Sequence, residues 1–304
     1  MAVLKETMRQ SLIRPTSTPH EPAGTAGQKA PLVRREADWT PEITARFWDW
    51  VAAHPPNQQS YFSAQVGEGI IRLLRYYGRL HGRALDYGCG PGHLIGRFLD
   101  SNLKIYGADV SARSVAMVNE EFAGRRNWGG AKVINGGVAP FEDGSFDLIS
   151  CIETVEHLGS AELDLMLADL RRLLSPTGTL FLTTPSEEDL NLAAAYCPFC
   201  NSEFHRWQHQ RTYSAGSLSA ILQQGGFKVL FCDSLSLQRF QAPLSRRRLL
   251  DYSPWHLLRY GRSYAFRLLD RVSLHFSIGP RIFAWLSSKP GPHLCAIAAK
   301  RDCD

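Results

Sequence analysis

The stretch ALDYGCGPGHL, residues 84–94, decides the fold. A short apolar strand ends in Asp86, glycines follow at positions 88, 90 and 92, and a helix begins directly behind them. Glycine lets the backbone turn tightly and approach a ligand without a Cβ clash, and the start of the helix presents free N–H groups. The stretch therefore predicts a nucleotide-type cofactor lying across the strand ends.

The spacing of these glycines narrows the class of cofactor. It is G-x-G-x-G, whereas dinucleotide enzymes use G-x-G-x-x-G, and position 93 is His. The difference favours a cofactor without a pyrophosphate. Asp109 ends the next strand, in KIYGADVS, where a carboxylate can accept hydrogen bonds from both hydroxyls of a ribose. We expect Ser111 to cap the following helix, which leaves Asp109 free for the ligand.

Outward from the glycine loop (residues 88–92), strand and helix patterns alternate. Alternation of this kind means right-handed crossovers and a parallel sheet. We predict an α/β fold: a Rossmann-like, seven-stranded, mostly parallel sheet with helices on both faces. The expected strands are 83–87, 104–109, 131–135, 146–151, 178–183, 227–233 and 293–300, and the expected helices are 92–99, 111–123, 161–174 and 214–224.

Three segments surround this core. Residues 1–36 are rich in Pro, Thr, Ala and Gly without periodicity, which predicts a disordered tail. Residues 37–82 predict an N-terminal helical extension, because Thr40-Pro41-Glu42 has the order of a helix start and a second amphipathic pattern covers about 61–79. The main domain is expected at 83–304, with a helical insert at 234–293 before the last strand.

Composition fits a globular protein, with 44% hydrophobic and 21% charged residues. No apolar run reaches the roughly 18–20 residues that span a bilayer, and Lys5 and Arg9 interrupt the only N-terminal apolar patch, so we expect a cytoplasmic protein. The insert 234–293 carries nine Arg and one Lys against two Asp, among many aromatics. It is interpreted as a lid, as a peripheral contact with an anionic membrane, or as a site for single-stranded nucleic acid. The pI of 8.8 makes nucleic acid the weakest of the three.

Four motifs resemble class I S-adenosylmethionine (SAM)-dependent methyltransferases in order and spacing: LDYGCGPG, GADVS, PFEDGSFDLISCIETVEHL and LRRLLSPTGTLFLTTP, within residues 83–233. The resemblance implies that Asp86 and the three glycines hold the methionine part of SAM and that Asp109 holds its ribose. The acidic residue that this family often has after the third strand is missing, which leaves adenine to backbone groups near Gly137 and Val138.

The implied function is methyl transfer from SAM to a small-molecule, sugar or lipid-linked acceptor, expected at oxygen. The alternatives are an RNA 2′-O-methyltransferase and a non-catalytic SAM-binding module.

Glu153, Glu156 and His157 lie at i, i+3 and i+4 after the fourth strand. On a helical turn they would share one face, where they could supply a base or bind a divalent metal. The segment resembles that of small-RNA 3′-end 2′-O-methyltransferases, in which Glu-x-x-Glu-His and a later His hold magnesium, and that of ubiquinone-pathway O-methyltransferases. Glu153 and His157 are the candidate catalytic residues; alternatively, the segment only orients its loop.

The segment CPFCNSEFHRWQH, residues 197–209, offers four ligands at C-x₂-C-x₄-H-x₃-H spacing. Two thiolates and two imidazoles suit tetrahedral zinc, so we predict a zinc site at Cys197, Cys200, His205 and His209. Two alternatives remain open. The cysteines could pack in the core while the histidines line the acceptor pocket, or His205 or His209 could complete a metal site with the Glu-x-x-Glu-His segment.

Overall fold

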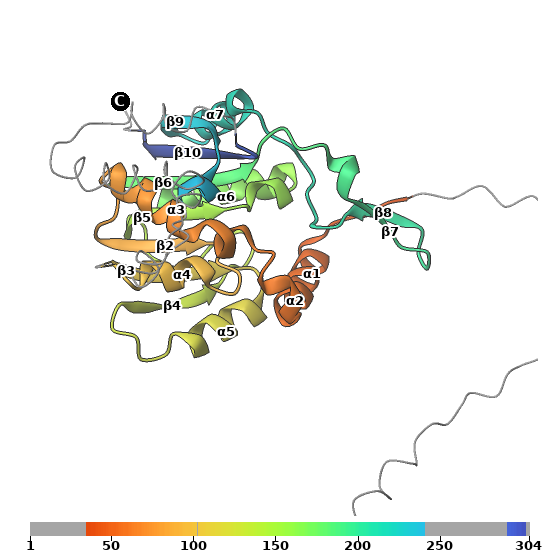
Figure 1. Ribbon diagram of the computed structural model, residues 1–304, viewed down its shortest axis with the longest axis horizontal. Coiled ribbons are helices and arrows are strands. Elements are labelled where there is room, and N and C mark those ends of the chain that lie inside the picture. The colour runs from red at the N-terminus through yellow and green to blue at the C-terminus, as the bar shows by residue number, and fades with distance from the viewer. Residues whose placement is uncertain (1–34, 102, 241–290, 302–304) are drawn as a thin grey trace, which may run out of the picture.

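The computed structural model describes residues 35–101, 103–240 and 291–301 (Figure 1). The predictions of a tail and of a basic helical insert fall mostly on residues 1–34 and 241–290, which lie outside the described residues. Within the described part of the chain, no helix is long and apolar enough to cross a membrane.

The centre of the molecule is a seven-stranded sheet in the order β4-β3-β2-β5-β6-β10-β9. Neighbours from β4 to β6 pair in parallel, while β10 runs antiparallel to both β6 and β9. The predicted α/β architecture is therefore confirmed. The strands are β2 (Arg83–Tyr87), β3 (Lys104–Asp109), β4 (Trp128–Val133), β5 (Phe146–Ile152), β6 (Leu174–Pro185), β9 (Phe227–Leu235) and β10 (His293–Lys300).

Both faces of the sheet are buried, because alternate side chains of each strand point to opposite sides. Ala84 belongs to one core with α3, α4 and α5, and its neighbour Leu85 belongs to the other core with α6 and α7. Helices therefore cover both faces, as predicted. They are α3 (Phe62–Tyr76), α4 (His93–Phe98), α5 (Ala112–Glu121), α6 (Ser160–Leu173) and α7 (Ala215–Gln224).

Two further helices, α1 (Pro41–Ala53) and α2 (Pro55–Gln58), lie beyond the carboxyl ends of the central strands (Figure 1). The Thr40 hydroxyl accepts the N–H of Ile43 and caps α1, as its sequence predicts. Asp49 ties α1 to the start of α5: its Oδ1 accepts the Ser111 hydroxyl at 2.5 Å and the N–H of Arg113 at 3.3 Å. The extension therefore covers the edge of the sheet at which α/β proteins bind ligands.

A small sheet forms an arm that projects past α1 (Figure 1). Its strands are β1 (Arg35–Glu36), β7 (Ala194–Tyr196) and β8 (Ser202–His205), in the order β1-β8-β7. Arg35 and Glu36 pair with Ser202 and Glu203. The prediction of a disordered tail is therefore wrong for these two residues. The 3-10 segments are η1 (Val155–His157), η2 (Leu190–Ala193) and η3 (Leu237–Phe240).

Candidate active site

The glycine loop has backbone conformations that require glycine. Gly88 and Gly90 have φ angles of 76° and 49°, in the left-handed region. A Cβ on Gly88 would lie 2.6 Å from Oγ1 of Thr154, and a Cβ on Gly90 would lie 2.9 Å from the ring of Tyr61. The loop can therefore pass close to both neighbours only without side chains, and Gly88 and Gly90 line a large cavity.

Gly92, the third glycine of the loop, is not among the residues that line this cavity. It faces Phe122 and Val118 instead, which corrects its assignment to the cofactor.

Two buried carboxylates flank this loop. Asp86 ends β2 and accepts the Ser150 hydroxyl at 2.7 Å, and its burial raises its pKa to about 7. Asp109 ends β3 and accepts the N–H groups of Gly90 (2.7 Å) and Ser111 (2.8 Å). Burial is also the largest influence on Asp109 and raises its pKa to about 6. Both side chains are costly to ionise without a cation or further donors beside them.

The adenine prediction is only partly matched by the geometry. Gly137 lines the cavity, and Val138 is not among its lining residues. Val138 pairs instead with Asn135: each donates its N–H to the carbonyl of the other, at 3.1 and 3.2 Å. The N–H of Val138 is therefore not free for a ligand, which corrects that half of the expectation. Asn135 and Gly136 line the cavity beside Gly137.

The Glu-x-x-Glu-His residues do not share one face, because only Val155–His157 turn helically. Glu153 lies outside the turn, with a φ of 48°. Its carboxylate accepts the Thr183 hydroxyl at 2.7 Å and lies 2.9 Å from Nδ1 of His293. Glu156 is fully buried, and its Oε2 accepts the Thr184 hydroxyl at 3.0 Å. Glu153 and His157 line the cavity, whereas Glu156 is not among its lining residues.

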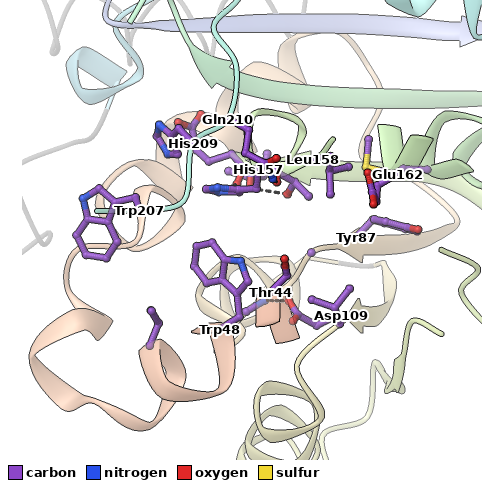
Figure 2. Close-up of a pocket in the computed structure, with 18 of the residues that line it drawn as sticks. Thr44, Trp48, Tyr87, Asp109, His157, Leu158, Glu162, Trp207, His209 and Gln210 are labelled. Atoms are coloured by element: carbon purple, nitrogen blue, oxygen red, sulfur yellow. Dashed lines mark hydrogen bonds between the residues drawn. The ribbon is translucent and has the colours of Figure 1, made fainter. Parts of the chain in front are cut away.

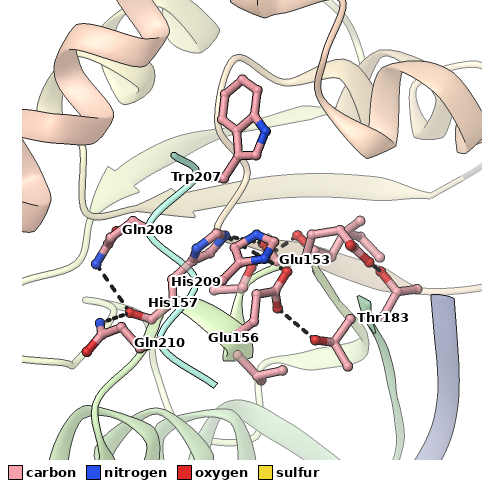
Figure 3. Close-up of polar contacts among 12 residues, drawn as sticks. Glu153, Glu156, His157, Thr183, Trp207, Gln208, His209 and Gln210 are labelled. Atoms are coloured by element: carbon pink, nitrogen blue, oxygen red, sulfur yellow. Dashed lines mark hydrogen bonds and ion pairs between the residues drawn. The ribbon is translucent and has the colours of Figure 1, made fainter. Parts of the chain in front are cut away.

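His157 has the environment of a permanently neutral imidazole. Its Nε2 lies 3.1 Å from the carbonyl oxygen of Glu153, which can only accept, so Nε2 carries the proton. Burial, followed by the charge of His209, lowers its pKa to about 3. The ring packs edge-on against Trp48, with 4.8 Å between the ring centres. It also lies beside His209, with 4.9 Å between the ring centres (Figure 3).

The predicted zinc ligands are not brought together. Cys197 and Cys200 lie in the turn between β7 and β8, where Cys200 is exposed. His205 ends β8, three residues beyond Ser202, and a strand rises about 3.3 Å per residue. That places the histidine about 10 Å along the hairpin from the cysteine turn. Because the hairpin is extended, the compact spacing in sequence does not give a compact site.

The histidines instead meet acidic side chains. Among the described residues, two groups of possible ligand atoms lie within 4.8 Å of one another: Glu156, His157 and His209, and Glu188, His205 and His209. A metal needs an unprotonated nitrogen. Nε2 of His157 is bound as a donor to a carbonyl, so its Nδ1, which has no hydrogen-bond partner among the described residues, is the nitrogen that this ring can offer. Nδ1 of His205 accepts two backbone N–H groups, which leaves the proton of the neutral ring on Nε2. Burial also raises the pKa of Glu156 well above its ordinary value.

Neither group contains Cys197, Cys200 or Glu153, so in this arrangement the residues fit neither the predicted four-ligand zinc site nor the complete Glu-x-x-Glu-His site that the resemblance implies.

One cavity of about 1050 Å³ extends from Gly88, Gly90 and Asp109 past Glu153 and His157 to His209. Figure 2 shows Asp109 and Tyr87 on one side of it, and Trp207 and His209 on the other.

Gln208 is fully buried behind the wall of the cavity at its far end from Asp109. Its Oε1 accepts the indole N–H of Trp48 at 2.8 Å. Its Nε2 donates to the Thr44 hydroxyl and to the carbonyl oxygen of His157, so Gln208 connects α1 to η1.

Sequence reasoning missed several of these residues: Trp48, Gln208, Glu188 and His293. Glu188 and His293 could have been suspected, because each lies within a few residues of a predicted strand end, next to the edge of the sheet where α/β proteins bind ligands. Trp48 and Gln208 carry no such signal. Trp48 lies on α1, which packs across the edge of the sheet. Its hydrogen-bond partner Gln208 lies 160 residues later in the sequence.

The residues at the other end of the cavity fit SAM. The glycine loop leaves room for the methionine part of SAM. Asp86 and Asp109 can pair with the positive charge and the hydroxyl groups of SAM. The family described as methyltransferase domain matches residues 59–230. A malonyl-[acyl-carrier protein] O-methyltransferase from Erwinia billingiae is 30% identical over 242 residues, which covers 73% of this chain and 92% of the relative.

A ubiquinone biosynthesis O-methyltransferase from Sinorhizobium medicae is 25% identical over 185 residues, covering 59% and 73%. The structure of an S-adenosylmethionine-dependent methyltransferase from Clostridium acetobutylicum has the same fold, with a TM-score of 0.51 at 11% identity, covering 86% of this chain and 99% of that one. Since the family match spans more than half of the chain and includes the glycine loop and both strand-end carboxylates, this protein belongs to the class I SAM-dependent methyltransferases.

Proposed function

We propose that this enzyme methylates a hydroxyl oxygen of an uncharged, aromatic small molecule. The observation that carries the proposal is the wall of the cavity, which runs from the glycine loop to a cluster of aromatic and imidazole rings. Among the described residues, this wall contains carboxylates and no Lys or Arg. Its acidic residues are Glu42, Asp86, Asp109, Glu153, Glu162, Glu188 and Asp189.

The cofactor end supplies the methyl donor. SAM carries its methyl group on a positively charged sulfonium, which makes that carbon open to attack. Asp86 and Asp109 are buried beside the glycine loop, and a cation there offsets the cost of ionising them. The loop and the two carboxylates therefore bind and orient the donor, while α1 and the arm exclude water from the remaining volume.

Charge decides between acceptor classes. Two like unit charges about 4 Å apart repel by about 4 kcal/mol at an effective dielectric constant of about 20. An acceptor with a free carboxylate or phosphate would meet this repulsion along the described wall, and an uncharged acceptor would not. Of the two relatives named above, the one named for ubiquinone biosynthesis supports an uncharged ring more than the one named for malonyl-[acyl-carrier protein] does.

Aromatic side chains favour a planar acceptor. Trp39, Trp48 and Trp207 line the cavity away from the glycine loop. Flat rings stack on such side chains or meet them edge-on, and each arrangement contributes about 0.5–1.5 kcal/mol beyond burial. A sugar or lipid-linked acceptor would use less of this surface at its reacting end.

The two other functions are less well supported. An RNA acceptor would bring phosphates to a wall without cations among the described residues, although nucleic-acid sites are lined by Lys and Arg. A non-catalytic SAM-binding module would have no use for a cavity that continues past the cofactor end to the rings around His209.

Mass spectrometry of reaction products tests the proposal. Purified enzyme and SAM are incubated with catechol, with 3,4-dihydroxybenzoate as its anionic counterpart, or with a short RNA. We expect O-methylated catechol to form at least ten times faster than the methylated benzoate, and no methylated RNA. Methyl transfer to RNA alone, or to the carboxylated ring in preference to catechol, would contradict the proposal.

A pair of variants checks the role of the wall. Glu162→Gln removes one cavity carboxylate and should narrow the preference for catechol over the benzoate. Asp164→Asn is the matched control, because Asp164 is exposed on the same helix and is not among the cavity residues. An equal change in both variants would mean that long-range charge, and not the wall, sets the preference.

A further inference from the structure

Glu188 and His209 form a close carboxylate–imidazole pair on the cavity wall. Oε2 of Glu188 lies 2.5 Å from Nδ1 of His209. Both residues line the cavity, with side-chain exposures of 26% and 11%. Glu188 follows the carboxyl end of β6, and His209 follows the arm strand β8, so the pair joins the sheet to the arm.

The pair fixes the tautomer of the imidazole. An ionised carboxylate can only accept hydrogen bonds, so the proton of a neutral His209 lies on Nδ1 and its Nε2 carries a free electron pair. His205 stacks on the ring at 4.3 Å, and its Nδ1 accepts the backbone N–H groups of Trp207 and His209. The ring of His209 is thus held from one side by a carboxylate and from one face by a second imidazole.

The other candidate groups are less able to take a proton. His157 has a pKa of about 3 and donates its Nε2 proton to a carbonyl. Both oxygens of Glu153 are already engaged, by Thr183 and His293. His293, like His209, has a carboxylate partner. Its ring, however, stacks on Phe62 with 3.9 Å between the ring centres, and the neighbouring residue Tyr61 contacts the glycine loop. His293 therefore belongs to the cofactor end, whereas His209 lies beside Trp207 and His157 at the acceptor end.

We propose that His209 is the general base of the reaction and that Glu188 is its positioning residue; the inference rests on the proposed O-methylation. The acceptor oxygen attacks the methyl carbon and forms the new C–O bond. The bond from that carbon to sulfur breaks and its electron pair goes to sulfur, while the hydroxyl proton passes to Nε2 of His209. Its imidazolium form is stabilised by Glu188.

The first test is a series of catechols whose hydroxyl groups differ in acidity. A positioned base contributes about 10²–10⁴-fold, and the benefit shrinks as the acceptor becomes a stronger acid. We expect His209→Gln to lower kcat by about 100-fold or more with catechol and much less with 4-nitrocatechol.

His293→Gln is the matched control, because His293 is also a cavity histidine bound to a carboxylate. Its rate loss should be the same for all acceptors. Glu188→Gln should lower kcat with catechol while leaving KM nearly unchanged, and Glu188→Asp should recover part of the loss. If instead His293→Gln gives the acidity-dependent loss, or if His209→Gln slows all acceptors equally, His209 is not the base.

The second test does not depend on turnover. In ¹⁵N-labelled, SAM-free enzyme, NMR should show His209 with a proton on Nδ1 and a bare Nε2, and Glu188→Gln should weaken that preference. A protonated Nε2 on neutral His209 would overturn the proposal whatever the substrate is. If the wild-type enzyme methylates no hydroxyl compound while the Nδ1 proton is present, the proposed O-methylation has failed and the Glu188–His209 pair itself stands.

Discussion

The two ends of the cavity are built in different ways. At the cofactor end, the glycine loop, Asp86 and Asp109 come from one continuous stretch of β2, α4 and β3, and backbone N–H groups hold the Asp109 carboxylate. At the acceptor end, Trp48, Glu188 and His209 come from α1, the end of β6 and the arm. The cofactor end is therefore set by local sequence, and the acceptor end by long-range packing that can vary without disturbing the cofactor.

The largest effect is expected at the glycine loop. Gly88→Val adds a branched side chain where even a Cβ would lie 2.6 Å from Thr154, at a φ of 76°. We expect calorimetry to show at least a 100-fold loss of SAM affinity. Gly124→Val is the control, because its φ of 74° imposes the same strain with nothing within 4 Å of the new Cβ. It should cost about 1–2 kcal/mol of stability and leave SAM affinity unchanged.

An equal loss of affinity in the Gly124 variant would show that backbone strain, and not crowding at the loop, accounts for the effect.

The second prediction uses the pKa values of Asp86 and Asp109, which burial raises to about 7 and about 6. Because the pKa values in the folded protein lie above the ordinary aspartate value of 3.8, the protonated carboxyls favour the folded state. This contribution is complete below pH 3.8 and is lost as the pH rises through 6 to 7. Cationic SAM favours the ionised forms, so its affinity should rise about tenfold between pH 5 and pH 8.

Calorimetry across this pH range measures the effect, and Asp86→Asn should flatten the upper part of the curve. Affinity that falls as the pH rises would contradict the assignment of these carboxylates to the cofactor end.

The third prediction concerns Gln208 at the acceptor end. Gln208→Leu removes the acceptor for the indole N–H of Trp48 and the donor to Thr44. A buried polar group left without a partner costs about 1–3 kcal/mol. We expect KM for catechol to rise about tenfold while the Kd for SAM changes by less than twofold. Gln223→Leu, on the exposed side of α7, serves as the control. A parallel loss of SAM affinity would mean that the two ends of the cavity are not independent.

The same contrast explains what the sequence could predict. Asp86, Gly88, Gly90 and Asp109 lie on the cavity wall because strand, turn and helix signals are local, and the order of the sheet follows from their alternation. Val138 was placed wrongly because its backbone closes a tight pair with Asn135. The cysteines were grouped with the histidines because spacing alone does not reveal an extended hairpin. Trp48 and Gln208 come together only through tertiary contacts.

The smallest effect is expected at the cysteines of the arm. Cys200 is exposed, and hydrogen bonding with Ser202, followed by hydrogen bonding with Cys197, lowers its pKa to about 7. A thiol with this pKa is partly ionised at neutral pH and reacts with iodoacetamide. Peptide mapping should therefore find Cys200 alkylated well before buried Cys89 and Cys151, whose burial raises their pKa. Because the arm turn lies about 10 Å from His205, alkylation should leave SAM binding and catechol methylation unchanged.

Cys197→Ser combined with Cys200→Ser should likewise leave metal content and turnover as in the wild type. Loss of one equivalent of zinc in this double variant would restore the four-ligand site and require the arm to fold back on itself. That rearrangement would take His209 away from Glu188, so one metal analysis bears on both the arm and the acceptor end of the cavity.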